Sequence, residues 1–213
     1  MDKSKKAVEL FDEYAQRYAD KFMDQSRYHD VLHQFCMAIN PADARVLDVA
    51  CGPGNITRYL LDQKPGLKIS GLDLSERMLV IAQQANPTAD FRLYDARQIS
   101  GLKQYFHAIV CGFGLPYFNK EEAIDFIAQA ARSLHPQGLL YFSTMEDLYE
   151  NSNWKGPSSG EDRKIFIHYH EADYLTRALD QNNFEILNLK RQAFPEPDGS
   201  ESTDLIVLAR KVG

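Results

Sequence analysis

The sequence predicts an α/β fold in which a doubly wound, mostly parallel sheet lies between layers of helices. Short apolar runs alternate with amphipathic segments along residues 45–144, which is the pattern of β-α repeats. A glycine-rich turn at residues 51–54 joins the first apolar run to a helical segment. Two apolar runs near the C-terminus follow each other without an intervening helix, so we expect an antiparallel strand at the sheet edge.

The N-terminal residues are predicted to be helical. Apolar side chains recur at steps of three and four between Val8 and Cys36, which indicates two amphipathic helices before the first strand. Asn40 and Pro41 then end this pattern. The run that follows, RVLDVA, is apolar enough to be buried on both faces of a parallel sheet.

The remaining strands alternate with helices that have recognisable start and stop signals. Ser75 can cap one helix, and Asn86–Pro87 ends it. Residues 147–163 are polar and rich in Asn, Ser and Gly, so we interpret them as an active-site flap, followed by a short strand at 165–170 and a helix at 171–181. The seven predicted strands of the sheet span residues 45–50, 67–73, 90–94, 106–111, 139–144, 184–194 and 202–212.

Composition favours one soluble domain. The chain has 213 residues, of which 44% are hydrophobic and 25% charged, and these are ordinary values for a globular protein. No apolar run approaches the roughly 20 residues that cross a bilayer, and no secretory leader is recognisable, so a cytoplasmic location is expected. The three cysteines show no paired spacing, which argues against a disulfide framework and a zinc site, and we expect no metal.

Net charge bears on the kind of partner. The chain carries a formal charge of −6 at pH 7, whereas affinity for nucleic acid comes mainly from Lys and Arg that neutralise phosphates. We therefore expect no nucleic-acid partner, and the short apolar runs predict no membrane partner either. A monomer and a homodimer both remain open.

The predicted strand ends bring polar residues together. In an open parallel sheet, ligands bind at the carboxyl ends of the strands, where the strand order reverses. Ala50, Gly52 and Gly54 let the backbone approach a ligand closely. Asp73, about 20 residues further on, is placed to accept both hydroxyls of a ribose, and Asp95 could accept the exocyclic amine of an adenine. Together these residues indicate an adenosine pocket.

The order of the motifs identifies a family resemblance. VLDVACGPGN, GLDLS, YDA, IVCGFGLPYF and LHPQGLLYF strongly resemble the successive motifs of class I S-adenosylmethionine-dependent methyltransferases, over Val46 to Thr144. The resemblance implies a Rossmann-like fold, S-adenosylmethionine as cofactor and S-adenosylhomocysteine as product. It also implies methyl transfer to an O, N or C nucleophile of a small molecule by in-line displacement. We expect a single methyltransferase domain over 1–213, made of a helical lid (1–40), a cofactor-binding core (41–145), and a substrate flap with a C-terminal hairpin (146–213).

The resemblance also implies roles for particular residues. The position of Asp48 organises the loop near the amino-acid part of the cofactor, and that of Asp73 binds the ribose. Leu74 and Met78 would flank the adenine, Asp95 and Ala96 would contact its edge, and Cys111 and Phe113 would line the sulfonium side. Ala50 departs from the commoner Gly. The implied cofactor-binding residues of the core are Asp48, Ala50, Cys51, Gly52, Gly54, Asn55, Asp73, Leu74, Met78, Asp95, Ala96, Cys111 and Phe113.

The N-terminal segment FDEYAQRYADKF resembles the helix that closes over the cofactor in small-molecule members of this family. Tyr14, Tyr18 and Arg27 are the candidates for reaching the methionine carboxylate. The alternative is that both tyrosines belong to the apolar stripe of a packed helix and that Arg27 is a surface charge.

A catalytic base would assist a hydroxyl, amine or carbon acceptor, although in-line displacement needs no covalent protein intermediate. The candidates are Tyr117, Glu146, His168 and His170. Because His168 and His170 alternate along a predicted strand, at most one of them faces the pocket. The alternative for each is a histidine with a purely structural role.

Two other functions fit the same fold class. An NAD(P)-dependent reductase is favoured by Asp73 but disfavoured because the third glycine of the dinucleotide fingerprint is missing and Asp48 lies inside the first strand. A non-catalytic, methyltransferase-like binding module is the other alternative, and the intact pocket motifs argue against it.

Overall fold

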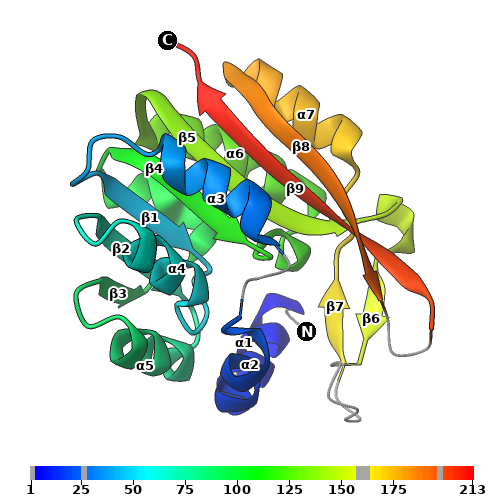
Figure 1. The fold of residues 1–213 in the computed structure, drawn as a ribbon. Coiled ribbons are helices and arrows are strands. Elements are labelled where there is room, and N and C mark those ends of the chain that lie inside the picture. The colour runs from blue at the N-terminus through cyan, green and yellow to red at the C-terminus, as the bar shows by residue number, and fades with distance from the viewer. Residues whose placement is uncertain (1–2, 25–27, 157–163, 196–198) are drawn as a thin grey trace.

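The computed structural model describes residues 3–24, 28–156, 164–195 and 199–213. Its centre is a seven-stranded sheet (Figure 1). The strands of this sheet are β1 (Arg45–Val49), β2 (Lys68–Asp73), β3 (Asp90–Leu93), β4 (Phe106–Gly112), β5 (Leu134–Glu146), β8 (Phe184–Pro195) and β9 (Glu201–Lys211). They lie in the order β3-β2-β1-β4-β5-β9-β8. β1 to β5 pair in parallel, whereas β9 runs antiparallel to both β5 and β8. The predicted fold class is confirmed.

Helices cover both faces of the sheet. They are α1 (Lys3–Glu13), α2 (Ala15–Phe22), α3 (His29–Ala38), α4 (Asn55–Gln63), α5 (Glu76–Ala85), α6 (Lys120–Ser133) and α7 (Ala172–Gln181). α3 and α4 pack on one face, and α6 and α7 pack on the other (Figure 1). The apolar runs of β1, β4 and β5 are continuous because these strands are buried on both sides.

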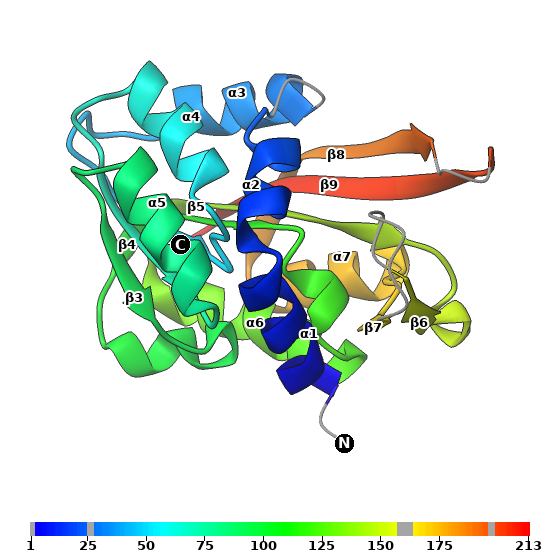
Figure 2. The same ribbon diagram turned by 90° about the horizontal axis from the view of Figure 1, so that it is seen from below.

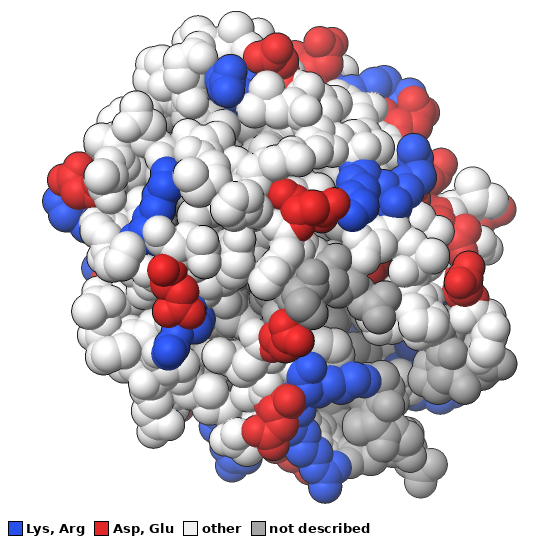
Figure 3. Space-filling view, viewed as in Figure 1, with Lys and Arg blue, Asp and Glu red and all other residues white. Residues whose placement is uncertain are grey.

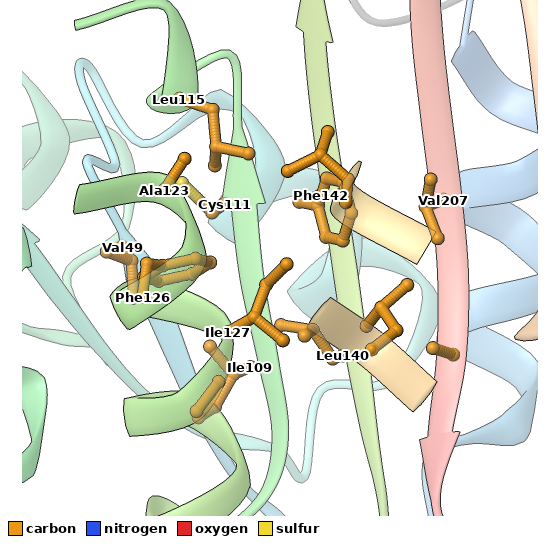
Figure 4. Packing of buried hydrophobic residues seen from close by; sticks show 14 of the residues in the cluster. Val49, Ile109, Cys111, Leu115, Ala123, Phe126, Ile127, Leu140, Phe142 and Val207 are labelled. Atoms are coloured by element: carbon orange, nitrogen blue, oxygen red, sulfur yellow. The ribbon is translucent and has the colours of Figure 1, made fainter. Parts of the chain in front are cut away.

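The larger core lies between the sheet and α6 and α7. Phe126 and Ile127 of α6 point toward Ile109 of β4 and Leu140 of β5, and all four side chains are fully buried (Figure 4). Burying large apolar side chains in this way contributes about 1.5–3 kcal/mol each. This layer holds β4 and β5 side by side. It thereby also positions the residues that follow these two strands.

Two helices begin with the local signals that the sequence contains. The Ser75 side chain accepts a hydrogen bond from the Met78 amide at 3.1 Å, so its predicted capping role is confirmed. At the start of α6, Asn119 and Glu122 form a capping box, with the Glu122 amide 2.9 Å from Asn119 Oδ1 and the Asn119 amide 2.8 Å from Glu122 Oε2. Both caps lie at the carboxyl edge of the sheet.

The N-terminal region differs from the prediction because the described residues before β1 form three helices, not two. Tyr14 separates α1 from α2 with φ −104° and ψ 17°, outside ordinary helical geometry. Helical hydrogen bonds continue on both sides, from the Tyr14 amide to Leu10 and from the Tyr18 amide to Tyr14. Apolar periodicity persists through this one-residue break, which is why the sequence pattern did not show it. We call α1 and α2 the lid helices; Figure 2 shows them in front of the strand ends.

The predicted flap is more ordered than expected where it is described. Tyr149–Asn151 form a 3-10 turn, and β6 (Asn153–Lys155) pairs antiparallel with β7 (Ile165–Ile167). Residues 157–163 lie outside the described part. Ile165 and Ile167 pack with Ala7 and Leu10 of α1 in a small core of their own. The predicted loop is therefore corrected to a small hairpin that packs against the lid helices.

The surface in Figure 3 carries interspersed charges, with Lys and Arg side chains lying close to Asp and Glu rather than gathered in one patch. Among the described helices, none is both long and apolar enough to cross a membrane. Within the described part of the chain, no group of three His, Cys, Asp or Glu side chains could hold a metal ion.

Candidate active site

A cavity opens at the carboxyl edge of the parallel strands, beneath the lid helices. It contains about 780 Å³ of atom-free space, part of it open to solvent. The residues that line it are Ser4, Ala7, Val8, Phe11, Tyr18, Ala50, Gly52, Asp73, Leu74, Met78, Tyr94, Asp95, Ala96, Arg97, Gly112, Phe113, Gly114, Tyr117 and Phe118. They come from the lid helices and from the segments that follow β1 to β4.

The turn after β1 depends on unusual backbone conformations. Ala50, Gly52 and Gly54 all have positive φ, at 52°, 52° and 78°. A Cβ on Gly54 would stand 2.6 Å from Nδ2 of Asn86, and this amide group donates a hydrogen bond to the Gly54 carbonyl at 3.0 Å. Ala50 is held in a left-handed conformation that costs about 1 kcal/mol or more for a non-glycine residue. Such strain is common where backbone approaches a ligand.

Asp73 joins the ends of β1 and β2. Its Oδ2 atom accepts the Gly52 amide at 2.8 Å and its Oδ1 atom accepts the Ser75 amide at 2.9 Å. Burial raises the pKa of Asp73, while these backbone hydrogen bonds act in the opposite direction. The carboxylate lines the cavity and holds the glycine turn in place.

Asp48 lies below the cavity and is not part of its lining. The residue is 1% exposed, and its Oδ2 atom accepts a hydrogen bond from the Thr57 hydroxyl at 2.7 Å. Burial raises the pKa of Asp48 to about 7. The side chain therefore connects β1 to α4 under the turn.

Asp95 lines the cavity with both carboxylate oxygens already engaged. Arg97 donates to it from Nε, Nη2 and its backbone amide at 2.8–3.1 Å. Although burial raises the pKa of Asp95, the bonds from Arg97 outweigh it and lower the pKa overall. The same guanidinium reaches Glu122 at 3.1 Å and the Ser4 hydroxyl of α1 at 3.4 Å. Arg97 thereby links the end of β3 to α6 and to the lid helices.

The structure brings most of the predicted cofactor residues to one cavity and leaves others beside it. Ala50, Gly52, Asp73, Leu74, Met78, Asp95, Ala96, Phe113 and Tyr18 line the cavity, whereas Tyr14, Asp48, Cys51, Gly54, Asn55 and Cys111 do not. Cys111 points into the core toward Ala123 and Leu115 (Figure 4). Arg27 lies outside the described residues.

Asn55 has an attachment role that the sequence did not show. Its Nδ2 atom donates to the Phe22 carbonyl at the end of α2 at 2.9 Å. A second attachment lies in the last turn of α1, where Asp12 Oδ1 accepts the Ser75 hydroxyl at 2.8 Å and the Arg77 amide at 2.9 Å. The two attachments join the lid helices to the N-termini of α4 and α5.

The two lid tyrosines have different positions. Tyr18 lines the cavity, with its ring near Gly52, and burial raises the pKa of its hydroxyl to about 12. Tyr14 packs beside the small core formed by α1 and β7. Of the described tyrosines on the lid helices, Tyr18 is therefore the one beside the glycine turn.

The four candidate bases are dispersed. Tyr117 lines the cavity, and burial raises the pKa of its hydroxyl well above the ordinary value. Glu146 lies elsewhere and is bound by Arg191 through two hydrogen bonds of 2.6 and 2.9 Å. His168 lies outside the lining, and its Nδ1 is 3.2 Å from the Tyr149 hydroxyl. Of these three candidates, Tyr117 lines the cavity, whereas Glu146 and His168 do not.

His170 is corrected to a structural residue. It is fully buried, and its Nε2 atom lies 2.8 Å from the Leu115 carbonyl, to which it must donate. Its Nδ1 atom then accepts a hydrogen bond from the Tyr174 hydroxyl. Burial lowers the pKa of His170 to about 4, so the ring is neutral and both of its nitrogens are engaged.

Several of the residues that line the cavity were not predicted from the sequence. Ser4, Ala7, Val8 and Phe11 come from α1, and their spacing of three, four and seven residues places them on one helical face. That spacing was visible, but small residues on an amphipathic helix do not distinguish a cavity wall from ordinary packing. Arg97 directly follows the predicted Asp95–Ala96 pair, but nothing in the sequence indicated that it lines the cavity.

The family is decided by a sequence match over the part of the chain that builds the cavity. Residues 46–138, from β1 to the start of β5, match the family described as methyltransferase domain. These residues form a methyltransferase domain. The strand order and the antiparallel β9 agree with this assignment.

Relatives of the methyltransferase domain are moderately similar in sequence. A demethylmenaquinone methyltransferase of Thermotoga maritima is 31% identical over 141 residues, which are 64% of this chain and 60% of that protein. A trans-aconitate 2-methyltransferase of Variovorax paradoxus is 35% identical over 100 residues, covering 47% and 38% respectively. The chain spans about half the length of the curated relatives it matches.

Solved structures resemble the methyltransferase domain across nearly its whole length. Magnesium protoporphyrin IX methyltransferase from Synechocystis, solved with bound S-adenosylhomocysteine, superposes with a TM-score of 0.72 at 17% identity, covering 99% of this chain and 100% of that one. A methyltransferase from Methanosarcina mazei gives 0.70 at 18% identity, with coverage of 86% and 97%. At this identity the likeness describes the fold.

Proposed function

We propose that this methyltransferase domain binds S-adenosylmethionine and transfers its methyl group to a small-molecule acceptor. The observation that carries the proposal is the pair of carboxylates Asp73 and Asp95, which face one cavity beside the open turn after β1. An adenosine moiety needs acceptors for ribose hydroxyls and an adenine amine, and these two residues supply them. The family match supports the same conclusion.

We propose a contact for each part of the cofactor from residues that line the cavity. In this proposal Asp73 accepts the ribose hydroxyls while keeping its bond to Gly52, and Leu74 and Met78 pack against the adenine. Ala96 lies at the edge of the base beside Asp95. Tyr18, whose ring lies near Gly52, is the residue we assign to the methionine carboxylate.

S-adenosylmethionine would supply an electrophilic methyl group on a sulfonium. The protein's own contribution is to align the acceptor and to exclude water, because in-line displacement needs no bond to the enzyme. The lid helices do this by covering the cavity with Phe11 and Tyr18. Gly112, Phe113 and Gly114 border the same space at the end of β4, where we place the reacting sulfur.

A small-molecule acceptor agrees with the relatives, which are named for demethylmenaquinone, trans-aconitate and the malonyl group of an acyl carrier protein. The cavity is bordered by the lid helices, which provide Ser4, Ala7, Val8, Phe11 and Tyr18 to its lining. We also propose that residues 1–213 act as a single domain, since the lid helices pack on α5 and β7, and the β8–β9 hairpin pairs with β5 in the seven-stranded sheet.

Titration calorimetry with S-adenosylhomocysteine tests the proposal. Wild type is expected to bind, and Asp73→Ala is expected to lose about 100-fold in affinity, because two charge-assisted hydrogen bonds disappear. Asp90→Ala, at the exposed start of β3, is the matched control and should bind like wild type. Binding of NADH without binding of S-adenosylhomocysteine would overturn the proposal in favour of a reductase.

A further inference from the structure

The wall of the cavity beyond the glycine turn is aromatic. Phe11 and Tyr18 come from the lid helices, and Phe113 and Tyr117 come from the segment after β4. The Phe11 ring meets the rings of Tyr18 and Tyr117 edge to face, with centroids 5.6 and 5.1 Å apart and planes inclined at 87° and 82°. Such rings favour a further planar ring in offset or edge-on contact.

Phe113 is held in this wall by a strained backbone. Its φ is 53°, which is rare for a bulky residue, and its amide donates to both the carbonyl and the hydroxyl of Ser143, at 3.2 and 3.0 Å. A Cβ on the next residue, Gly114, would stand 2.6 Å from the sulfur of Cys111. The Phe113 ring also packs on Tyr28 at 5.2 Å, which fixes its other side. The wall is therefore rigid in the region next to the end of β4.

The charges of the cavity do not favour an anionic acceptor. Of the described lining residues, the charged ones are Asp73, Asp95 and Arg97. The Arg97 guanidinium is already bound to Asp95, Glu122 and Ser4. An acceptor carboxylate would thus meet two carboxylates in a partly desolvated space, and the described lining offers it no unengaged cationic side chain.

The polar groups of this aromatic wall are the side-chain hydroxyls of two tyrosines. Within the described part of the chain, the hydroxyls of Tyr18 and Tyr117 have no hydrogen-bond partner, although both residues line the cavity. Burial raises the pKa of both hydroxyls, so each keeps its proton and can donate it to an oxygen. With Tyr18 assigned to the cofactor, Tyr117 is left for the acceptor.

We infer that the acceptor is an uncharged, hydroxylated aromatic ring that packs against Phe11 and Phe113 and accepts a hydrogen bond from Tyr117 through its oxygen. This inference rests on the proposed function and deepens it by naming the substrate class. The acceptor oxygen, positioned by the Tyr117 hydroxyl, forms a bond to the methyl carbon as the S–CH3 bond breaks, and the sulfur keeps the electron pair. The hydroxyl proton then leaves the methylated oxygen and passes to solvent as the product is released.

Calorimetry with the protein loaded with S-adenosylhomocysteine tests this inference without relying on turnover. The probes are 2-naphthol, the anion 2-naphthoate and the saturated alcohol trans-2-decalol. We expect 2-naphthol to bind at least about tenfold more tightly than either of the others, since it alone combines a neutral hydroxyl with a flat ring. Equal or tighter binding of naphthoate or decalol would overturn the inference, as would no binding of naphthol.

Tyr117→Phe isolates the hydrogen bond. It should weaken 2-naphthol about fivefold, the worth of one neutral hydrogen bond, and leave 2-methylnaphthalene unchanged. Tyr105→Phe, on an exposed tyrosine before β4, is the control and should change neither. If Tyr117→Phe weakens both probes equally, its hydroxyl is not the contact. The affinity for S-adenosylhomocysteine, measured on the same variants, separates failure of this inference from failure of the proposed function.

Discussion

At the scale of single residues, burial changes the chemistry of Asp48 more than any neighbouring charge does. Its carboxyl group is almost fully enclosed beneath the glycine turn, and the one short bond from Thr57 does not replace the lost water. Desolvation therefore raises its pKa from 3.8 to about 7. Burial also raises the pKa of the neighbouring Asp73.

This shift predicts a dependence of stability on pH. A carboxyl group with a raised folded-state pKa stabilises the protein below its unfolded pKa of 3.8, and that contribution is lost as the pH rises toward 7. The free energy of urea unfolding of wild type, relative to Asp48→Asn, should fall by about 4 kcal/mol across this window. Asp62→Asn, an exposed partner of Arg58, should behave like wild type. Parallel pH profiles of wild type and Asp48→Asn would contradict the prediction.

At the scale of elements, the lid helices are attached by hydrogen bonds near the C-terminal end of each helix. Asp12 binds the first turn of α5, and Asn55 holds the end of α2, while Ala7 and Leu10 pack on the β6–β7 hairpin. Lys3 lies 3.4 Å above the Phe166 ring, which adds a cation-π contact to this hairpin. Because these contacts are separate from the main core, we expect the lid helices to open without unfolding of the sheet.

Asp12→Ala should loosen the lid helices selectively. Hydrogen bonds to a charged group contribute about 1.5–3 kcal/mol, so we expect S-adenosylhomocysteine to dissociate about tenfold faster while the unfolding midpoint changes little. Stopped-flow displacement measures the rate. Asp20→Ala, on the exposed side of α2, is the matched control. An unchanged dissociation rate in Asp12→Ala would show that this attachment does not govern ligand release.

At the scale of the whole molecule, stability resides in the layers on either side of the sheet. The layer under α6 and α7 contains Phe126 with no exposed surface, at the centre of the larger core (Figure 4). Phe126→Ala should lower the unfolding free energy by about 3–5 kcal/mol, through lost burial and the cavity left behind. Val80→Ala, on an exposed side chain of α5, should stay within about 0.5 kcal/mol of wild type. Equal effects in urea unfolding would contradict this assignment of the core.

How much of the structure the sequence predicts depends on how far apart along the chain the interacting residues lie. The strands and the Ser75 cap were predictable because apolar runs and capping residues act within a few positions of the chain. The strand-end carboxylates Asp73 and Asp95 were predictable because parallel strands bring their carboxyl ends to one edge. The break at Tyr14 and the β6–β7 hairpin were not, since each depends on packing against a distant segment.

The sequence by itself determined the α/β repeat, the glycine turn and the residues that follow each strand, because local periodicity and steric preference specify these features. Only the tertiary structure decided which side chains face the cavity. His170 is removed from it by a bond to Leu115, 55 residues away, whereas Arg97 of the β3 edge is brought against Ser4 of α1, 93 residues away. Contacts of this range depend on how helices dock on the sheet, and no pattern within a short window contains that information.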